Sequence, residues 1–145
     1  MTLDEILALW DVDSTIDKTD LANESLKIPK LHHKYYSIFV RERLASLKAS
    51  QSYDERRDLL DRWLAGDLDS ETLKEHNLEI QRKMLTKAER EKRIDLLPEI
   101  ATTKLKMALQ REKVEVLESI IKTLATRGYQ IKTAVDFMRW QSGGF

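Results

Sequence analysis

The chain has 145 residues, which is enough for one domain and too few for two of ordinary size. Charged residues make up 34% of it, and it contains only four glycines and two prolines, a mixture that favours long solvated helices over sheets. The absence of cysteine excludes disulfides and thiolate metal sites, and it fits a reducing cytoplasm. Because the N-terminus lacks a basic leader and no uncharged apolar run approaches about 18 residues, we expect neither export nor membrane spanning.

The net charge is zero, but the charges are unevenly distributed along the chain. Acidic residues dominate from Asp4 to Glu24, and basic residues dominate from Lys27 to Lys48, where Glu42 is the single acid. Strong local asymmetry beneath a neutral total indicates a charged partner. The alternative is that both stretches are solvated helix faces without a partner.

The first helices are predicted from capping signals. A capping box, Thr-x-x-Glu at residues 2–5, predicts a short helix that continues to the loop expected at residues 11–18. Thr19 or Asp20 then caps another short helix. Pro29 either ends that helix or begins the next, because proline suits the first turn of a helix and not its interior.

The stretch from Pro29 to Ala65 contains no decisive helix breaker, and Gly66 is a natural stop. A continuous helix over these residues would be roughly 55 Å long at about 1.5 Å per residue. A helix of that length in a small protein usually packs against a second long helix.

Residues 67–97 are rich in charge and give weaker signals. Residues 66–70 predict a turn, and Thr72 with Glu75 forms a second possible capping box. The bases after Arg82 predict an exposed helix with some disorder.

The last third of the chain has the clearest helical pattern. Pro98 predicts a helix start, and residues 126–128, Thr-Arg-Gly, predict its end with a basic last turn and a glycine. A short final helix with Phe137 and Trp140 on one face follows, and Gly143 lies beyond its end.

Two apolar stripes run along this last third. One has the heptad spacing of a coiled-coil seam and consists of Ile100, Met107, Val114, Leu117, Ile121 and Leu124. The other lies on a second face and consists of Leu105, Leu109, Val116 and Ile120. One helix hairpin buries one stripe, so two stripes require two neighbours. We therefore predict an all-α protomer, a long helical hairpin, that self-associates through the heptad residues of its C-terminal helices; the alternative is a monomer with a three-helix core.

The sequence offers little for an enzyme. It has no phosphate-binding loop and no dinucleotide fingerprint. His32 and His33 are adjacent, so on a helix they point roughly 100° apart and cannot share one metal ion. We expect no cofactor, no metal and no catalytic residue; an enzyme with an unfamiliar carboxylate site is a distant alternative.

A nucleic-acid site is better supported, because cations and aromatic rings interleave from Lys34 to Arg43. Cations follow phosphates, and rings offer stacking surfaces worth about 1–3 kcal/mol per base. The alternative is that Tyr35 and Phe39 are core residues and only the cations face water. The candidate DNA-binding residues are Lys34, Tyr36, Arg41, Arg43, Lys48, Arg56, Arg57 and Arg62. The chain thus divides into a DNA-binding helical region (1–66), a charged connecting segment (67–97) and a helical oligomerisation region (98–145).

The ends of the chain carry a family resemblance. The run Arg-Gly-Tyr-Gln-Ile-Lys at 127–132, then Asp-Phe-Met-Arg-Trp at 136–140 and Gly143, resembles the C-terminal end of the UvsY family, the recombination mediators of T-even-type bacteriophages. Residues 16–66 are also similar to the family without gaps, and the region around Ala88 is similar more loosely.

The resemblance implies a function that periodicity alone does not give. Such mediators bind single-stranded DNA together with the phage single-strand-binding protein and help a recombinase of the RecA type to nucleate its filament. They form rings of six or seven subunits through the C-terminal region, in the cytoplasm of the host cell. A ring would repeat one basic patch per subunit, so that avidity multiplies weak contacts of a neutral protomer.

One departure from the family pattern concerns the DNA site. The family's basic positions in the long helix fall on Asp58 and Leu60 of this chain, and neither side chain can contact phosphate favourably. Arg56, Arg57 and Arg62 lie within about a turn and are expected to substitute for them. The rival interpretation is a structural or adaptor protein whose helices bind only other proteins.

Overall fold

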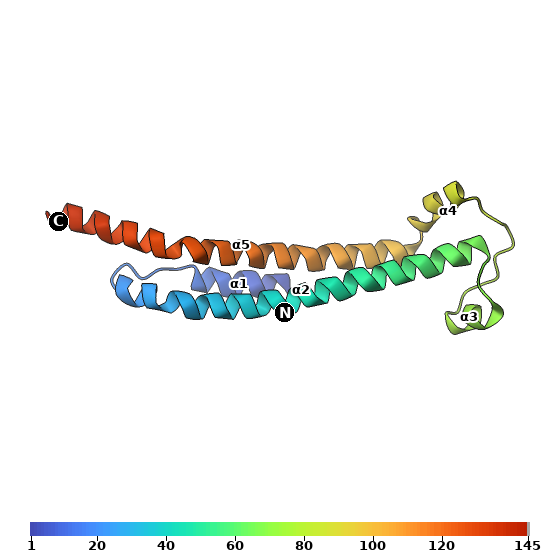
Figure 1. Ribbon diagram of the computed structural model, residues 1–145, viewed down its shortest axis with the longest axis horizontal. Helices are drawn as coiled ribbons and strands as arrows, with labels where there is room; N and C mark the ends of the chain where they lie inside the picture. Colours follow the sequence, from blue (N-terminus) through green and yellow to red (C-terminus); the bar gives the residue numbers. More distant parts are fainter. Residues whose placement is uncertain (145) are drawn as a thin grey trace. The chain divides into compact units, whose positions relative to one another are not determined.

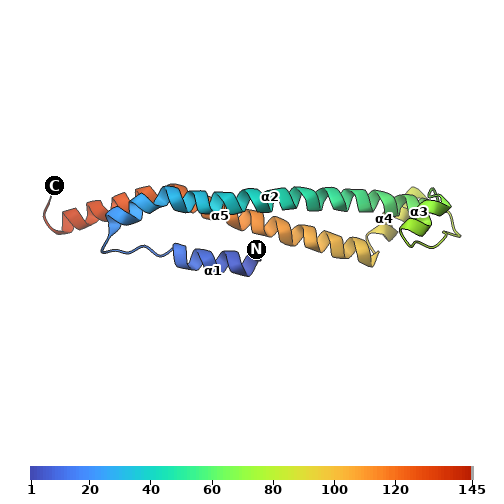
Figure 2. The same cartoon turned by 90° about the horizontal axis from the view of Figure 1, so that it is seen from below.

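The computed structural model describes residues 1–144, and within them it contains helices and connecting segments but no strand. The helices are α1 (Leu3–Asp13), α2 (Leu21–Ala65), α3 (Ser70–Glu75), α4 (Lys87–Ile94) and α5 (Pro98–Gln141). Two of them are long, with 45 residues in α2 and 44 in α5, and they run antiparallel within each part of the fold (Figures 1 and 2). The predicted all-α fold, built on two long helices, is confirmed.

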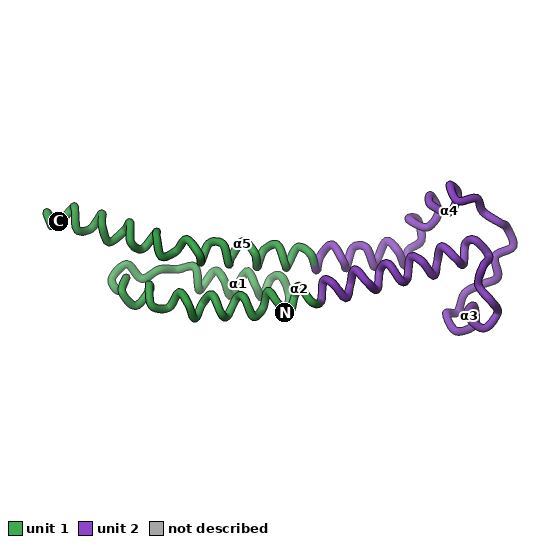
Figure 3. The backbone as a smooth tube through the Cα atoms, viewed as in Figure 1, with its two compact units in different colours: residues 1–44, 111–145 green, residues 45–110 purple. Residues whose placement is uncertain are grey.

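The chain forms two compact units (Figure 3). The first combines residues 1–44 with residues 111–145, and the second consists of residues 45–110. Each unit contains part of α2 and part of α5. The division into residues 1–66, 67–97 and 98–145 assigns DNA binding, connection and oligomerisation to successive parts of the chain. It differs from the two compact units and stays a prediction.

The core of the first unit is made by three helices. Ile6 of α1, Tyr35 of α2 and Leu117 of α5 are all fully buried in one cluster, which Ile120 and Leu124 complete. Val116 and Ile120 of the second apolar stripe on α5 belong to this core together with Ile6 of α1, whereas Leu105 and Leu109 of that stripe are exposed. A three-helix core, the alternative weighed from the sequence, describes this unit.

The second unit has a separate core in which the connecting segment folds back on α2 and α5. Leu60 and Leu64 of α2 pack with Leu85, Ile94 and Ile100. Trp63 packs against this cluster, and its indole donates a hydrogen bond of 2.6 Å to the carbonyl of Glu79. The connecting segment (67–97), expected to be exposed and partly disordered, thus contributes the buried Leu85 and Ile94, and α3 and α4 are its helical parts.

Several helix ends follow their predicted signals. The capping box of Thr2 and Glu5 is present, with backbone-to-side-chain hydrogen bonds of 2.8 and 3.1 Å. Gly66 ends α2 with a φ of 77°, and the amide of Asp67 bonds back to the carbonyl of Arg62, which together make a Schellman motif. Pro98 is the first residue of α5, as expected.

Two other start and stop predictions need correction. The helix predicted to end before residue 11 continues to Asp13, so the loop is shorter than expected. The second capping box does not form, because Asp69 caps α3 instead, its side chain accepting a hydrogen bond of 2.8 Å from the amide of Thr72. Asx residues are strong N-caps, and this one comes three residues before the predicted cap.

Pro29 neither ends nor begins a helix, so that prediction is wrong. It lies inside α2, nine residues into a helix that begins at Leu21. A proline there removes the hydrogen bond to the carbonyl of residue 25, at a cost of about 3 kcal/mol. Pro29 and Ser25 are both exposed, so water can solvate the carbonyl that is left without a donor. The buried Glu24 and Tyr35 on either side keep the helix continuous.

Gly128 does not end a helix either, and the predicted short final helix is the last part of α5. Its φ is not positive, in contrast to that of Gly143, the true terminal glycine, whose φ is 74°. Arg127 and Ile131 are buried on either side of Gly128, so packing holds the backbone helical through it.

Replacing Gly128 with alanine should stabilise the protein by about 0.5–1 kcal/mol, because glycine costs that much more than alanine inside a helix. A Cβ at Gly128 meets no atom within 4 Å, so nothing opposes the gain. The matched control is Gly66→Ala, where the space is equally open but the positive φ makes alanine destabilising. Urea unfolding followed by circular dichroism measures the change in unfolding free energy for both variants. If both changes had the same sign, the helical conformation assigned to Gly128 would be contradicted.

Candidate nucleic-acid interface

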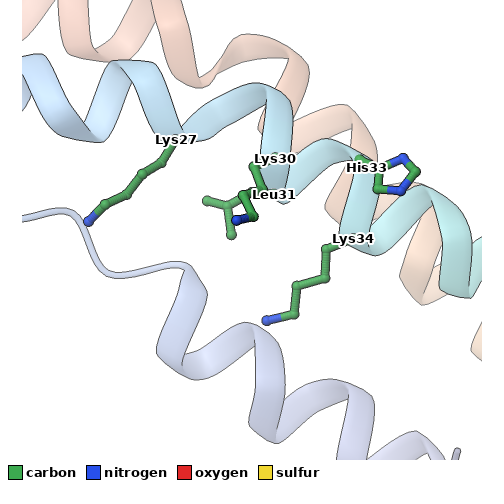
Figure 4. Close-up of a pocket in the computed structure, with 5 residues that line it drawn as sticks. All are labelled: Lys27, Lys30, Leu31, His33 and Lys34. Atoms are coloured by element: carbon green, nitrogen blue, oxygen red, sulfur yellow. The ribbon is translucent and has the colours of Figure 1, made fainter.

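The basic part of α2 forms a hollow on the surface of the first unit. It has a volume of about 470 Å³ and is lined by Lys27, Lys30, Leu31, His33 and Lys34. Figure 4 shows Lys27 and Lys34 extending toward the side of α2 where α1 and its following loop run, whereas His33 points away from them. Of the lining residues only Lys34 was among the predicted DNA contacts. The signal for Lys27 was available in the sequence, because it precedes Lys34 by seven residues and therefore shares its helix face.

Lys34 contacts the end of α1. Its Nζ lies 2.6 Å from Asp13 Oδ2, and the phenol of Tyr35 donates a hydrogen bond of 2.7 Å to the same oxygen. Partial burial acts to raise the pKa of Asp13, but the hydrogen bonds from Lys34 and Tyr35 outweigh it and hold that pKa below its ordinary value. Burial, and next the Asp13 carboxylate, raise the pKa of Tyr35. Lys34 therefore already binds an oxyanion, and that anion belongs to its own chain.

Tyr36 is half exposed and points away from the hollow. Its ring stacks on His32 at a centroid distance of 5.7 Å, and it lies 6.1 Å from Phe39 in a tilted arrangement. Residues two apart on a helix are separated by about 200°, so Lys34 and Tyr36 cannot serve the same short stretch of strand. Tyr35 and Phe39 belong to the core of the first unit, as the alternative interpretation held.

Arg41, Arg43 and Lys48 are exposed on α2, and no ion pair or hydrogen bond joins their side chains to any described residue. The one acid among them, Glu42, is turned inward, where it lies near Lys113 at 3.7 Å and near the N-terminal ammonium at 3.8 Å. These three cations are therefore available to a polyanion.

Arg56 and Arg57 have a different environment, in the second unit. Arg56 forms an ion pair with Glu99 of α5, and its guanidinium lies 3.4 Å from His76. Arg57 donates to Asp95 at 2.7 Å and to the hydroxyl of Tyr53 at 3.2 Å. The hydrogen bond from Arg57 lowers the pKa of Asp95.

These two arginines hold α2 to α5 and to the segment before it, so their charge is balanced within the unit. Their assignment as phosphate contacts stays a prediction.

Arg62 is exposed and pairs with Asp58 one turn earlier, at 3.2 Å. An exposed pair of this kind contributes only about 0.3–0.5 kcal/mol, so phosphate can displace the carboxylate at little cost. Leu60, which the resemblance aligned with a basic residue of the family, is buried in the core of the second unit. Its burial explains why a leucine stands there.

Residues 1–144 contain no group of three or more histidine or carboxylate side chains that could hold a metal ion. No helix within the same residues has an apolar stretch long enough to cross a membrane.

The sequence matches a protein-family model over residues 9–144, and that family is described as the recombination, repair and ssDNA binding protein UvsY. The chain belongs to the UvsY family. Among curated proteins, no sequence matches it. The resemblance inferred from residues 16–66 and 127–143 is thereby confirmed.

The fold is that of a solved UvsY protein. Two crystal structures of the bacteriophage T4 recombination mediator protein UvsY, lattice types IV and II, superpose with TM-scores of 0.84 and 0.85. Each is 15% identical to this chain; the first match covers 97% of this chain and 99% of that one, and the second covers 98% of both. At that identity the likeness establishes the fold of this UvsY-family chain.

The predicted oligomerisation residues of this UvsY-family chain lie mainly toward its own core. Ile100, Leu117 and Leu124 are buried within the protomer, and Met107, Val114 and Ile121 are half-buried. A buried side chain cannot meet a second copy while the protomer stays folded. Leu105 and Leu109 are among the exposed apolar residues of α5, at 61% and 56% exposure. The assignment of the heptad residues to self-association stays a prediction.

A second exposed apolar group lies near the end of α5. Phe137 and Trp140 lie 5.9 Å apart in a tilted arrangement, and Tyr129 is exposed two turns earlier. A groove of about 640 Å³ runs beside Tyr129, Thr133 and Phe137. Clustered exposed aromatic residues are typical of protein–protein contact surfaces.

Proposed function

We propose that this protein binds single-stranded DNA and acts as a recombination mediator in a bacteriophage. The observation that carries the proposal is the match of residues 9–144 to a family of recombination, repair and single-stranded-DNA-binding proteins. The exposed cations Arg41, Arg43 and Lys48 support it, because they are not balanced by acids of the described chain. Exposed cations of this kind attract the sugar-phosphate backbone without reading bases.

The proposal includes the step that the family's mediators perform. The protein holds the strand beside the phage single-strand-binding protein and helps a RecA-type recombinase to load, in the cytoplasm of the host cell. It acts as a binding protein without a cofactor, so the chemistry of nucleotide hydrolysis belongs to the recombinase. This agrees with the four glycines of the chain, at positions 66, 128, 143 and 144, which cannot form a phosphate-binding loop.

Self-association completes the proposal. Leu105 and Leu109 on α5 and the aromatic group at Tyr129, Phe137 and Trp140 are the exposed apolar surfaces that a second copy would cover. Six or seven copies would repeat the basic surface of α2, and linked weak contacts raise the overall affinity without any new contact.

Fluorescence anisotropy of a labelled single-stranded oligonucleotide tests the DNA role, with the duplex of the same sequence as control. We expect tight binding to the single strand, with the logarithm of the binding constant falling linearly against the logarithm of the salt concentration, by about 0.7 for each phosphate contacted. A protein that binds neither oligonucleotide at low salt would instead be an adaptor for other proteins.

A further inference from the structure

Cations repeat every seven residues along one face of α2. Lys27, Lys34 and Arg41 follow this spacing, and Lys30 stands between the first two. Seven residues make nearly two helical turns, so successive members lie about 10.5 Å apart along the axis and only about 20° apart around it. Lys30 lies three residues after Lys27 and four before Lys34, which places it on the same face. The four side chains form one row, which we call the basic row.

The basic row borders the hollow beside α2. Lys27, Lys30 and Lys34 line that hollow, and Lys27 and Lys34 point the same way from the helix (Figure 4). Between them Leu31 turns to the core of the first unit. The row therefore presents ammonium groups along a depression in the surface, and a chain of phosphates can lie in such a depression.

The charges of the row are only partly balanced. Lys27 pairs with Glu24 at 3.1 Å, and Lys34 pairs with Asp13 at 2.6 Å. Lys30 and Arg41 are exposed and have no ion-pair partner among residues 1–144. Like charges three and four residues apart on a helix repel one another. Glu24 and Asp13 relieve this repulsion at Lys27 and Lys34, and a further anion would relieve it at Lys30.

The carboxylate on Lys34 indicates which chemistry the row takes. Asp13 reaches this ammonium from α1, so an oxyanion fits on the side where the hollow lies. The rings nearest the row do not belong to it: Tyr36 faces away with His32, and Tyr35 is buried. The row itself thus consists of cations and contains no aromatic ring.

We propose that Lys27, Lys30, Lys34 and Arg41 form the phosphate track along which single-stranded DNA lies, a proposal that rests on the DNA-binding function above. The track contacts the backbone and leaves the bases unread. It places the strand on the first unit. Arg56 and Arg57, whose charge Glu99 and Asp95 balance, belong to the second unit and are not part of the track.

The double variant Lys30→Gln/Arg41→Gln tests the track, because neither side chain has an ion-pair partner to lose. The matched control is Arg111→Gln/Lys122→Gln, which removes the same two residue types from exposed positions on α5 in the same unit. Neither of these side chains has an ion-pair partner among the described residues either. Anisotropy with labelled oligo-dT is measured from low to moderate salt, and circular dichroism verifies that both variants fold as the wild type does.

We expect the row variant to bind about tenfold or more weakly at low salt and to lose about 1.4 from the salt slope, which is two contacts at about 0.7 each. The control should retain the wild-type affinity and slope. If the wild type binds and the two variants weaken binding equally, or neither weakens it, the track is overturned and the DNA-binding function stands. Absence of wild-type binding overturns that function, and the track with it.

Discussion

Replacing Arg127 with methionine should lower the free energy of unfolding by about 3 kcal/mol, toward the lower end of the cost of breaking a buried ion pair. The Arg127 side chain is 3% exposed in the middle of α5. It donates to the carbonyls of Asp13 and Thr15 at 2.8 and 3.1 Å, and it lies 3.5 Å from the carboxylate of Glu24. One guanidinium thus ties α5 to the end of α1 and to the start of α2.

The size of this effect follows from what methionine leaves behind. Two carbonyls lose their donors, and Glu24, which is also buried, loses a cation. Lys27 still pairs with Glu24, and the buried Nε of Arg127, which has no hydrogen-bond partner, is removed as well. The remaining Lys27–Glu24 pair and the removal of this unpartnered nitrogen each offset part of the lost stability. We therefore expect a cost near the lower end of the range for breaking a buried ion pair.

Urea unfolding monitored by circular dichroism measures the difference against the control Arg139→Met. Arg139 is an exposed arginine of the same helix, and its replacement should change stability by less than about 0.5 kcal/mol. Adding Glu24→Gln to Arg127→Met should recover part of the loss, because an amide costs less than a carboxylate to leave buried without a cation. If Arg139→Met destabilised as strongly as Arg127→Met, the ion pair would not be the cause.

The elements with local signals could be predicted from the sequence, and those decided by packing could not. The cap at Thr2, the stop at Gly66 and the start at Pro98 depend on residues within one turn of the helix end. Pro29 and Gly128 carry equally strong local signals, and the structure overrides both. Their neighbours along the helix are buried against other helices, and that energy exceeds the local cost.

The candidate site divides in the same way. The excess of cations between residues 27 and 48 is visible in the sequence, and Arg41, Arg43 and Lys48 are exposed as expected. The ion pairs of Arg56 and Arg57 were not predictable, because their acids lie 43 and 38 residues further along the chain. Which acid faces which arginine depends on how α2 and α5 align, and no local pattern fixes that alignment.

The heptad pattern of α5 identified an apolar face correctly but did not reveal what covers it. A seam of this kind packs equally well on a helix of the same chain and on a second copy. Leu117 and Leu124 are covered by α1 and α2 of their own protomer. The sequence favoured self-association because it offered few other helices to cover the second stripe. Val116 and Ile120 of that stripe pack in the core with Ile6 of α1, and Leu105 and Leu109 remain exposed for a second copy to cover.

Leu117→Ala should therefore destabilise the protomer by about 2–5 kcal/mol, the cost of truncating a fully buried leucine. Leu117 is 0% exposed in the core shared with Ile6 and Tyr35. The control is Leu26→Ala, the same substitution at a position in the same unit that is 78% exposed, where we expect a change below about 0.5 kcal/mol. Thermal and urea unfolding measure both variants.

The mass of the assembly, measured by sedimentation, then distinguishes residues that pack in the protomer's own core from residues that contact a second copy. A folded Leu117→Ala protein should keep the wild-type assembly mass, because its missing atoms face its own core. The double variant Leu105→Lys/Leu109→Lys should instead shift the mass toward the protomer, because two charges on an exposed apolar stripe oppose its burial by a second copy. A mass lowered by Leu117→Ala at unchanged stability would restore the heptad seam as the interface, since only a residue that contacts another copy can alter assembly without weakening its own fold.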